Sequence, residues 1–376
     1  MGEQSGGMDM KRMVSVLCIV VVLISFVACT NKTNQPSPVV AGQASEAATE
    51  TVATPSPTIA CIYAELTSEF WGIAANGANT ALKELKASGK ISGDSYLAAP
   101  SLARDVEQQK VLIDEAIAKK VDGIVLSAAN ADEIGIHLSN TMVNLADGGI
   151  PIIAIDCSIT VPDTFDCVVS TNKMDIALMS MECGKIAAES VDKNGDYVYI
   201  EIDTSSSGLW DRFRGAVEWL EKNASDMHRL DIADDGIFWA SPAGGIDSIQ
   251  PFIEEELLEK IAKDTNLVIL AATEPYTIEA CKAIKESGIQ RTGKTMVIGF
   301  GFSQQMYDHI KIGEVYGTVG QNPYLMGYES VYMMAEYLVD NKRLEEFTYV
   351  PFTVVTQNNL ETEEVKEYLQ VMEISI

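Results

Sequence analysis

From Ile59 onward, short apolar segments alternate with longer amphipathic segments along almost the whole chain. The first apolar segments are IACIYA, SYLAAPS, VDGIVLSA and IPIIAID, and the segments between them, such as DVEQQKVLIDEAIAKK, carry apolar residues at helical spacing. Strands that alternate with helices of this length are typical of βαβ units, which form parallel sheets. Because the strands are continuously apolar, we expect helices on both faces of the sheet.

The alternation starts a second time near residue 195. Five further apolar segments are each followed by a segment with helical periodicity, and VPFTVV is predicted as one last strand before an acidic helix; the five are DYVYIEID, DGIFWASP, NLVILAAT, TMVIGFG and VYGTVGQNP. The sequence therefore predicts an α/β fold of two doubly wound lobes. Ligands of open α/β sheets bind beyond the carboxyl ends of the strands, so two such lobes are expected to enclose a cleft.

The N-terminus predicts export. Lys11 and Arg12 precede an uncharged apolar run at residues 13–28, which is shorter than the roughly 20 residues of a spanning helix. The run ends in small Ala28, which is typical of a signal peptide cut before Cys29. An uncleaved anchor helix is the alternative, and both interpretations place the remaining chain outside the cytoplasmic membrane. Residues 29–57 are rich in Thr, Ser, Ala and Pro, which predicts a disordered tether.

The segment FVAC before the tether resembles the bacterial lipoprotein box, although the family usually has Leu in place of Phe26. This resemblance implies that Cys29 is diacylated and becomes the new N-terminus. We therefore expect a lipid-anchored protein at the outer face of the cytoplasmic membrane or in the periplasm.

Charge and cysteine content argue against several kinds of partner and of stabilising site. The formal charge of −27 argues against nucleic acid or anionic lipid as a partner. Of the 7 cysteines, Cys18 and Cys29 precede the folded part, which leaves an odd number for any disulfide framework. Cys157 and Cys167 flank one short loop, where either a pair or two free thiols are open. Scarce His and the lack of ligand spacing predict no metal site.

Several motifs, in order from about Ile59 to Thr356, resemble the bacterial periplasmic sugar-binding protein family of the ribose and galactose type. They are TSEFW, IPIIAID, STNKMDIALMSMECGKIAAE, DRFRGAVEWL, TMVIGFG and GTVGQNPYLMGYESV. The resemblance implies a type I periplasmic binding protein fold with a hinge of three segments, near Thr171, Gln321 and Phe352. The N-terminal lobe would comprise 58–170 plus 322–351, and the C-terminal lobe 171–321 plus 352–376.

The same resemblance implies ligand residues in the first lobe. Phe70 and Trp71 would stack on a sugar ring, although one of them alternatively belongs to the core. Ser68 would contact ligand or only cap a helix. Asp156, at the end of IPIIAID, would accept hydroxyl hydrogen bonds or only form a turn.

In the second lobe and the hinge, the resemblance points to three more positions. The fork of Arg212 would donate to ligand oxygens, or Arg212 would be a surface residue paired with an acid. Gln321 matches the family's ligand-contacting Gln. Asn172 would contact ligand or cap the following helix.

The chain also departs from the family. Gly301 replaces the Asp of its GFD motif, Thr273 replaces an Asn, and Ser127 is the polar residue that ends the third strand. Losing a buried carboxylate changes which ligand hydroxyls can be paired. The resemblance therefore implies the fold and the site positions, while the ligand's identity stays open.

No nucleophile elbow, phosphate-binding loop, zinc-protease motif or dinucleotide fingerprint appears, so we expect neither an enzyme nor a cofactor. The resemblance implies a receptor that delivers a sugar or polyol to an ABC permease in the membrane. The alternative is a sensor that presents its ligand-loaded form to a chemoreceptor or histidine kinase. Both use closure of two lobes around a ligand.

Overall fold

The computed structural model describes residues 56–142, 149–161, 168–201, 207–230, 237–239, 245–259 and 261–375. The predicted signal peptide, Cys29, the tether up to residue 55 and the pairing of Cys157 with Cys167 lie outside these residues. Thr54–Ile376 forms one compact unit, which is built on two sheets. No helix in the described ranges is long and apolar enough to cross a bilayer.

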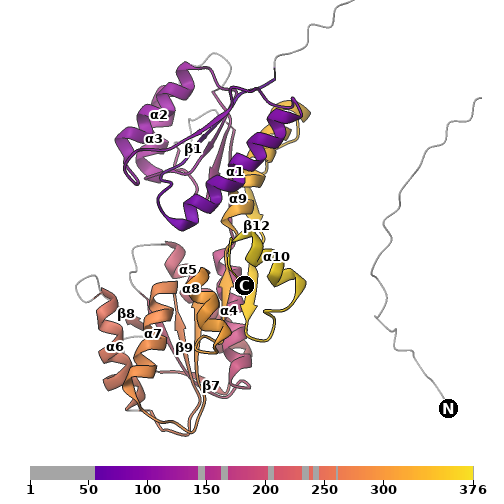
Figure 1. The fold of residues 1–376 in the computed structure, drawn as a ribbon. Helices are drawn as coiled ribbons and strands as arrows, with labels where there is room; N and C mark the ends of the chain where they lie inside the picture. Colours follow the sequence, from indigo (N-terminus) through magenta and orange to yellow (C-terminus); the bar gives the residue numbers. More distant parts are fainter. Residues whose placement is uncertain are drawn as a thin grey trace, which may run out of the picture. The chain divides into compact units, whose positions relative to one another are not determined.

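The first sheet is six-stranded and parallel, in the order β12-β5-β4-β3-β1-β2 (Figure 1). Its strands are β1 (Ile59–Ile62), β2 (Tyr96–Ala98), β3 (Gly123–Leu126), β4 (Ile152–Ile155), β5 (Val169–Met174) and β12 (Phe347–Val350). Ile62 pairs with Leu126, and Leu126 pairs with Ala154. The carboxyl ends of these strands therefore meet at one edge of the sheet.

Helices cover both faces of this sheet, as predicted. On one face α1 (Glu69–Ala87) packs along α9 (Pro323–Asp340), and on the other α2 (Val106–Ala118) contacts α3 (Ala131–Met142) (Figure 1). Alternate residues of a strand point to opposite faces. Accordingly, Ile59 and Cys61 pack with the α1 and α9 side, and Ala60 and Ile62 with the α2 and α3 side.

The second sheet is seven-stranded, in the order β13-β11-β10-β9-β6-β7, with β8 also paired to β6. It is parallel except for β13, which runs antiparallel to β11. The strands are β6 (Gly195–Glu201), β7 (Met227–Arg229), β8 (Ile237–Trp239), β9 (Leu267–Ala271), β10 (Thr295–Phe300), β11 (Gly317–Gly320) and β13 (Thr353–Thr356).

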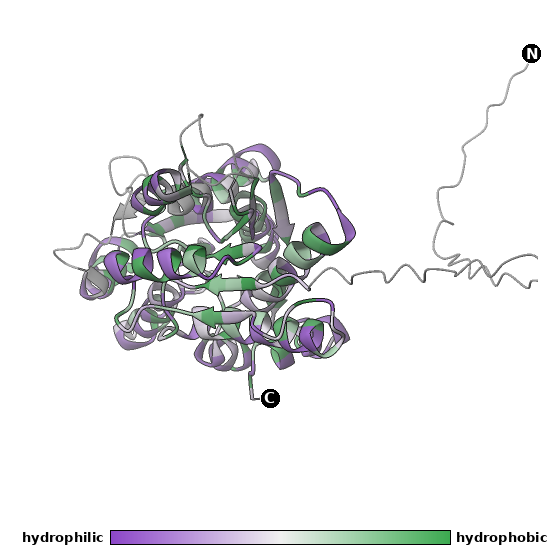
Figure 2. Cartoon of the chain, turned by 90° about the horizontal axis from the view of Figure 1, so that it is seen from above, coloured by the Kyte–Doolittle hydropathy of each residue, from purple (hydrophilic) through white to green (hydrophobic). Residues whose placement is uncertain are grey.

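Two groups of helices enclose this second sheet. One face carries α4 (Ile176–Ser190) and α5 (Ser207–Asn223). The other face carries α6 (Ile249–Pro251), a π-helical segment (Phe252–Leu258), α7 (Glu274–Ser287), α8 (Gln304–Lys311) and α10 (Glu363–Val371). In Figure 2 the strands contain green, hydrophobic segments and the helices carry both colours, as amphipathic helices on apolar sheets should.

Two features of the chain between the sheets differ from the sequence prediction. VPFTVV is not one strand, because Pro351 lies between β12 in the first sheet and β13 in the second. Proline fixes its φ angle and restricts the residue before it, so the chain turns there. In addition, β5 was not predicted, and it stays in the first sheet through Met174, beyond the predicted crossing at Thr171.

β5 was not predicted because its residues are mainly polar, and strands were recognised by runs of apolar residues. Ser170, Thr171 and Asn172 are all buried, and specific partners compensate for their burial. The Ser170 hydroxyl donates to the Glu345 carbonyl at 2.6 Å, and the Asn172 amide donates to two acceptors on α9. Buried polar groups are stable when such bonds exist, and a sequence pattern does not reveal them.

Candidate binding cleft

A cavity of about 360 Å³ lies at the carboxyl ends of second-sheet strands and reaches α1 of the first lobe. This volume falls in the usual range of small-molecule sites, about 300–1,000 Å³. The lining residues come from α1, from α5, from the segments after β9, β10 and β11, and from the end of α10. They are Glu69, Phe70, Ile73, Arg212, Thr273, Glu274, Pro275, Phe300, Gly301, Phe302, Ser303, Gln321 and Met372.

The two predicted aromatic residues have different roles. Phe70 is half-buried and lines the cavity, whereas Trp71 is 7% exposed and belongs to the core. The Trp71 ring meets Phe70 and Tyr63 edge-on, with ring centroids 5.2 and 5.9 Å apart. Trp71 therefore belongs to the core packing behind Phe70, and Phe70 alone of the two lines the cavity.

The hydroxyls of the two serines that were predicted to contact ligand accept hydrogen bonds from backbone N–H groups. The Ser68 hydroxyl accepts from the Trp71 N–H at 3.5 Å and caps α1. The Ser127 hydroxyl is buried and accepts from the Ala64 N–H at 2.9 Å, which fixes the chain just after β1. Neither serine is among the described residues that line the cavity.

Asp156 and Asn172 also lie outside the cavity lining. Asp156 has a φ of 71°, and burial raises the pKa of its carboxyl although Arg212 and Arg104 act against this. The Asn172 amide donates to the Met326 carbonyl at 3.2 Å and the Ser330 hydroxyl at 3.0 Å, which joins β5 to α9. Asn172 does not cap α4, because that role belongs to Asp175.

Arg212 is packed into the floor of the cleft. Its guanidinium lies 4.1 Å from the centre of the Phe300 ring, and Nη1 donates to the Ala272 carbonyl at 2.8 Å. Its Nε is buried without a hydrogen-bond partner among the described residues. Burial lowers the pKa of this guanidinium, while Glu201 and Asp156 favour its charged form.

Thr273, Gly301 and Gln321 line the cavity at the ends of β9, β10 and β11. The Thr273 hydroxyl oxygen is buried and has no partner among the described residues, and it does not cap α7. Gly301 has a φ of 98°, which an L-residue rarely adopts, so an aspartate here would strain the backbone. The Gln321 carbonyl accepts from the Tyr368 hydroxyl at 2.8 Å.

Sequence reasoning missed three polar residues of the lining: Glu69, Glu274 and Ser303. The Glu274 carboxylate accepts from the Ser303 hydroxyl, and burial raises the pKa of this carboxyl, with Glu69 adding to the rise. All three residues stand at helix starts, where their types are common as caps or first-turn residues. Glu274 and Ser303 could have been predicted from the sequence, because they follow β9 and β10, and ligands bind beyond the carboxyl ends of such strands.

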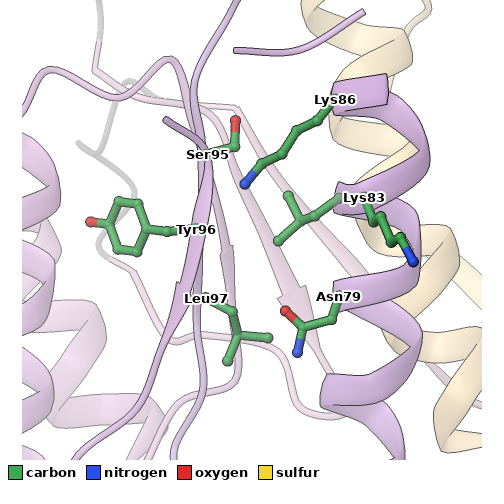
Figure 3. Close-up of a pocket in the computed structure, with 7 residues that line it drawn as sticks. Asn79, Lys83, Lys86, Ser95, Tyr96 and Leu97 are labelled. Carbon is green, nitrogen blue, oxygen red and sulfur yellow. The ribbon is translucent and has the colours of Figure 1, made fainter. Parts of the chain in front are cut away.

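A second cavity, of about 390 Å³, lies within the first lobe between α1 and the edge strand β2 (Figure 3). Figure 3 shows Lys83 and Lys86 on the helix and Ser95, Tyr96 and Leu97 on the strand side. The Ser95 hydroxyl is already used, because it accepts from the Ile59 N–H at 2.9 Å. This cavity contains none of the predicted ligand residues, so the cavity at the strand ends is the better candidate.

These features define a two-lobed α/β binding protein with a polar cavity at the strand ends. The periplasmic binding protein domain family matches residues 59–342, and the chain belongs to this family. The resemblance and the fold class predicted from the sequence are therefore confirmed. A comparison with curated protein sequences found no match.

Many solved structures share the fold, at low sequence identity. A solute-binding protein of an ABC transporter from Agrobacterium vitis, with bound D-fucose, is 21% identical with a TM-score of 0.61, and the match covers 82% of this chain and 98% of that one. A sugar-binding protein of a sugar ABC transporter from Bacillus halodurans is 20% identical with a TM-score of 0.65, covering 81% and 99%. A periplasmic ribose ABC transporter protein from Conexibacter woesei is 16% identical with a TM-score of 0.65, covering 85% and 96%.

Proposed function

We propose that the protein is an extracytoplasmic solute-binding lipoprotein that captures a small polar ligand, a sugar or polyol, and delivers it to an ABC importer. The observation that carries the proposal is the cavity to which α1 of the first lobe and the strand ends of the second lobe both contribute. The family and the sugar-bound structures of the same fold support this class of ligand.

The lining has the chemistry that a sugar needs. Phe70 supplies an aromatic face for the apolar side of a ring. The Thr273 hydroxyl and Arg212 Nε are buried polar atoms without partners among the described residues, so ligand hydroxyls would satisfy them. We propose that Gln321 contacts the ligand at the hinge, and that Asp156 approaches it from the first lobe as the lobes close.

The proposed lobes are those predicted from the sequence, 58–170 plus 322–351 and 171–321 plus 352–376. The first boundary is moved to Met174, because β5 belongs to the first sheet up to that residue. A ligand that contacts both lobes binds the closed form more tightly than the open form and so shifts the population toward closure. We further propose that a signal peptide is removed before Cys29. Lipid on Cys29 and a tether at 29–57 would then hold the binding unit beside its permease.

The test is a thermal-shift screen of the chain from Thr54 onward, which forms one compact unit. The library contains pentoses, hexoses, polyols, nucleosides and amino acids. A ligand at a hundred times its dissociation constant adds about 2.7 kcal/mol of stability. A shift with a sugar or polyol supports the proposal, and a shift confined to another chemical class overturns the sugar assignment.

Two variants then locate the site. Phe70→Ala should weaken binding about tenfold with little loss of stability, because its ring faces the cavity. Trp71→Phe should instead lower stability by about 1–2 kcal/mol and leave affinity nearly unchanged, because Trp71 is in the core. If Phe70→Ala lowered stability but left affinity unchanged, Phe70 would not belong to the binding site.

A further inference from the structure

Two carboxylates line the cleft without an ion-pair partner among the described residues. Glu69 comes from the first turn of α1 and Glu274 from the first turn of α7, so the two lobes each contribute one. Neither forms an ion pair within the described residues. The Glu274 carboxylate accepts from the neutral Ser303 hydroxyl. His309 favours the charged form of Glu274 without bonding to it, because its own ion-pair partner is Glu314.

The cation of the cleft does not compensate these two acids. Arg212 is held against the Phe300 ring and the Ala272 carbonyl, and its charge interacts with Asp156 and Glu201. The remaining lining is apolar or neutral, apart from Glu69 and Glu274. The cavity therefore has an excess of negative charge, which comes from the first turns of α1 and α7.

The dipoles of α1 and α7 explain only one of the two carboxylates at the starts of these helices. A carboxylate is favourable in the first turn of any helix, which suffices for the exposed Glu69. Glu274, however, is half-buried at the cavity wall, and burial opposes its charged form. Glu69 also disfavours the ionised form of Glu274, so the two charges act on one another across the cleft. Closure without a neutralising group brings like charges together in a less solvated space.

We propose that the ligand carries a protonated amine beside its hydroxyl groups, as an amino sugar or amino polyol does, and that the amine binds between Glu69 and Glu274. This inference rests on the proposed sugar-binding function. An ammonium group has three donors and no acceptor capacity, which suits a lining of carboxylate oxygens and hydroxyls. The unpartnered, buried Thr273 hydroxyl stands directly before Glu274 and supplies one more acceptor. The ring of Phe70, next to Glu69, adds an aromatic face for a cation.

The test compares matched ligands on the chain from Thr54 onward by calorimetry at pH 7. D-Glucosamine and D-galactosamine are the amine probes, D-glucose and D-galactose the neutral ones, and N-acetyl-D-glucosamine the uncharged control of larger size. We expect the better amine to bind about tenfold or more tightly than its neutral counterpart, since charge-assisted hydrogen bonds are roughly twice as strong as neutral ones. The preference should shrink as salt screens the charges.

Glu274→Gln should reduce the amine preference, which is the ratio of amine to neutral-sugar affinity, to about onefold. Glu286→Gln is the matched control, because Glu286 is an exposed acid near the other end of α7. Melting of each variant without ligand verifies that it is folded. Equal binding of amine and neutral sugars by the unaltered protein, or equal binding of the N-acetyl sugar, overturns the inference and leaves the proposed function intact. Failure of these five sugars and of every sugar and polyol in the thermal-shift library overturns both.

Discussion

Two threonines at the start of α7 show that one residue can contribute to stability and a near neighbour to ligand binding. Thr273 is the N-cap position of the helix, and Thr277 lies in its first turns. The Thr277 hydroxyl donates to the Thr273 carbonyl at 2.8 Å, so its hydrogen-bonding capacity is used inside the helix. The Thr273 hydroxyl, one turn earlier, is buried at the cavity without a partner among the described residues. An unpartnered buried hydroxyl costs free energy in the unliganded protein, and a ligand that pairs with it recovers that cost.

Thr273→Val should therefore raise the stability of the unliganded protein by about 1 kcal/mol and weaken ligand binding about tenfold. Valine has nearly the same shape and lacks the hydroxyl. Thr277→Val is the control, and it should lower stability by about 1 kcal/mol with no specific effect on binding. Denaturant unfolding and calorimetry measure the two effects. A loss of stability in Thr273→Val would show that the hydroxyl is already paired.

Two glutamates should respond to pH with opposite signs. Burial and Glu69 raise the pKa of Glu274 above its ordinary 4.5, although Ser303 and His309 act against the rise. The folded protein then binds this proton more tightly than the unfolded chain, so stability falls as the pH rises from about 4.5. Lys285 and His309 lower the pKa of Glu314 below 4.5, so its contribution is present at neutral pH and is lost on acidification.

Glu274→Gln should consequently stabilise the unliganded protein at pH 7, and the gain should vanish below about pH 4.5. Glu314→Gln should destabilise it at pH 7, and that loss should also shrink on acidification. Urea unfolding of both variants from pH 4 to 7 provides the comparison. Parallel pH profiles for the two variants would contradict the assignment.

At the scale of elements, α1 and α9 come into backbone contact through two glycines. A Cβ at Gly77 would lie 2.0 Å from the Tyr324 carbonyl oxygen, and one at Gly327 would lie 1.9 Å from the Ala74 carbonyl oxygen. The contact brings α9, from late in the chain, against the helix that presents Glu69 and Phe70. It therefore positions one wall of the cleft.

Gly77→Ala should destabilise the protein by about 3 kcal/mol, because the new methyl group overlaps a backbone carbonyl that cannot move freely. The direction is informative, since alanine usually stabilises a helix by about 1 kcal/mol relative to glycine. Gly93→Ala is the control, because a Cβ there meets nothing within 4 Å. Thermal unfolding measures both, and a stabilised Gly77→Ala would exclude the close contact.

The elements also show what the sequence could predict. Apolar periodicity predicted the strands that are buried between helices, such as β1, β3 and β4, within a few residues. It could not predict β5, whose polar residues are paired with groups far away in the sequence. The resemblance to the sugar-binding family pointed to Phe70, Arg212 and Thr273, but it did not show which way neighbouring side chains point. Phe70 lines the cavity while Trp71 enters the core, and only packing decides this.

At the scale of the whole molecule, the charge of −27 bears on where the protein resides. An acidic body is repelled by anionic lipid head groups, so its net charge does not hold it at such a membrane. The proposed lipid on Cys29 would then supply the attachment to the membrane. A single acyl chain binds only weakly, so the two chains of a diacylated cysteine are needed for stable anchoring.

Cys29→Ser should accordingly release the protein from the membrane fraction while ligand binding stays unchanged. Fractionation of cells that express either form, followed by immunoblotting, measures the distribution. A control, Cys61→Ser, alters a buried thiol of the folded body and should leave the protein at the membrane. Retention of Cys29→Ser at the membrane would favour an uncleaved anchor helix instead.

The late return of α9 and β12 to the first sheet has a consequence for how the protein acquires its structure. A chain made from its N-terminus presents β1 to β5 early, yet the helix that covers one face and the strand at one edge arrive only with residues 323–350. Until then that face and edge stay open, and contacts this distant in sequence form slowly. Neither lobe is complete until almost the whole chain has been made, because β13 and α10 of the second lobe follow at Thr353–Thr356 and Glu363–Val371. This order favours a chain that stays unfolded until its synthesis is almost finished.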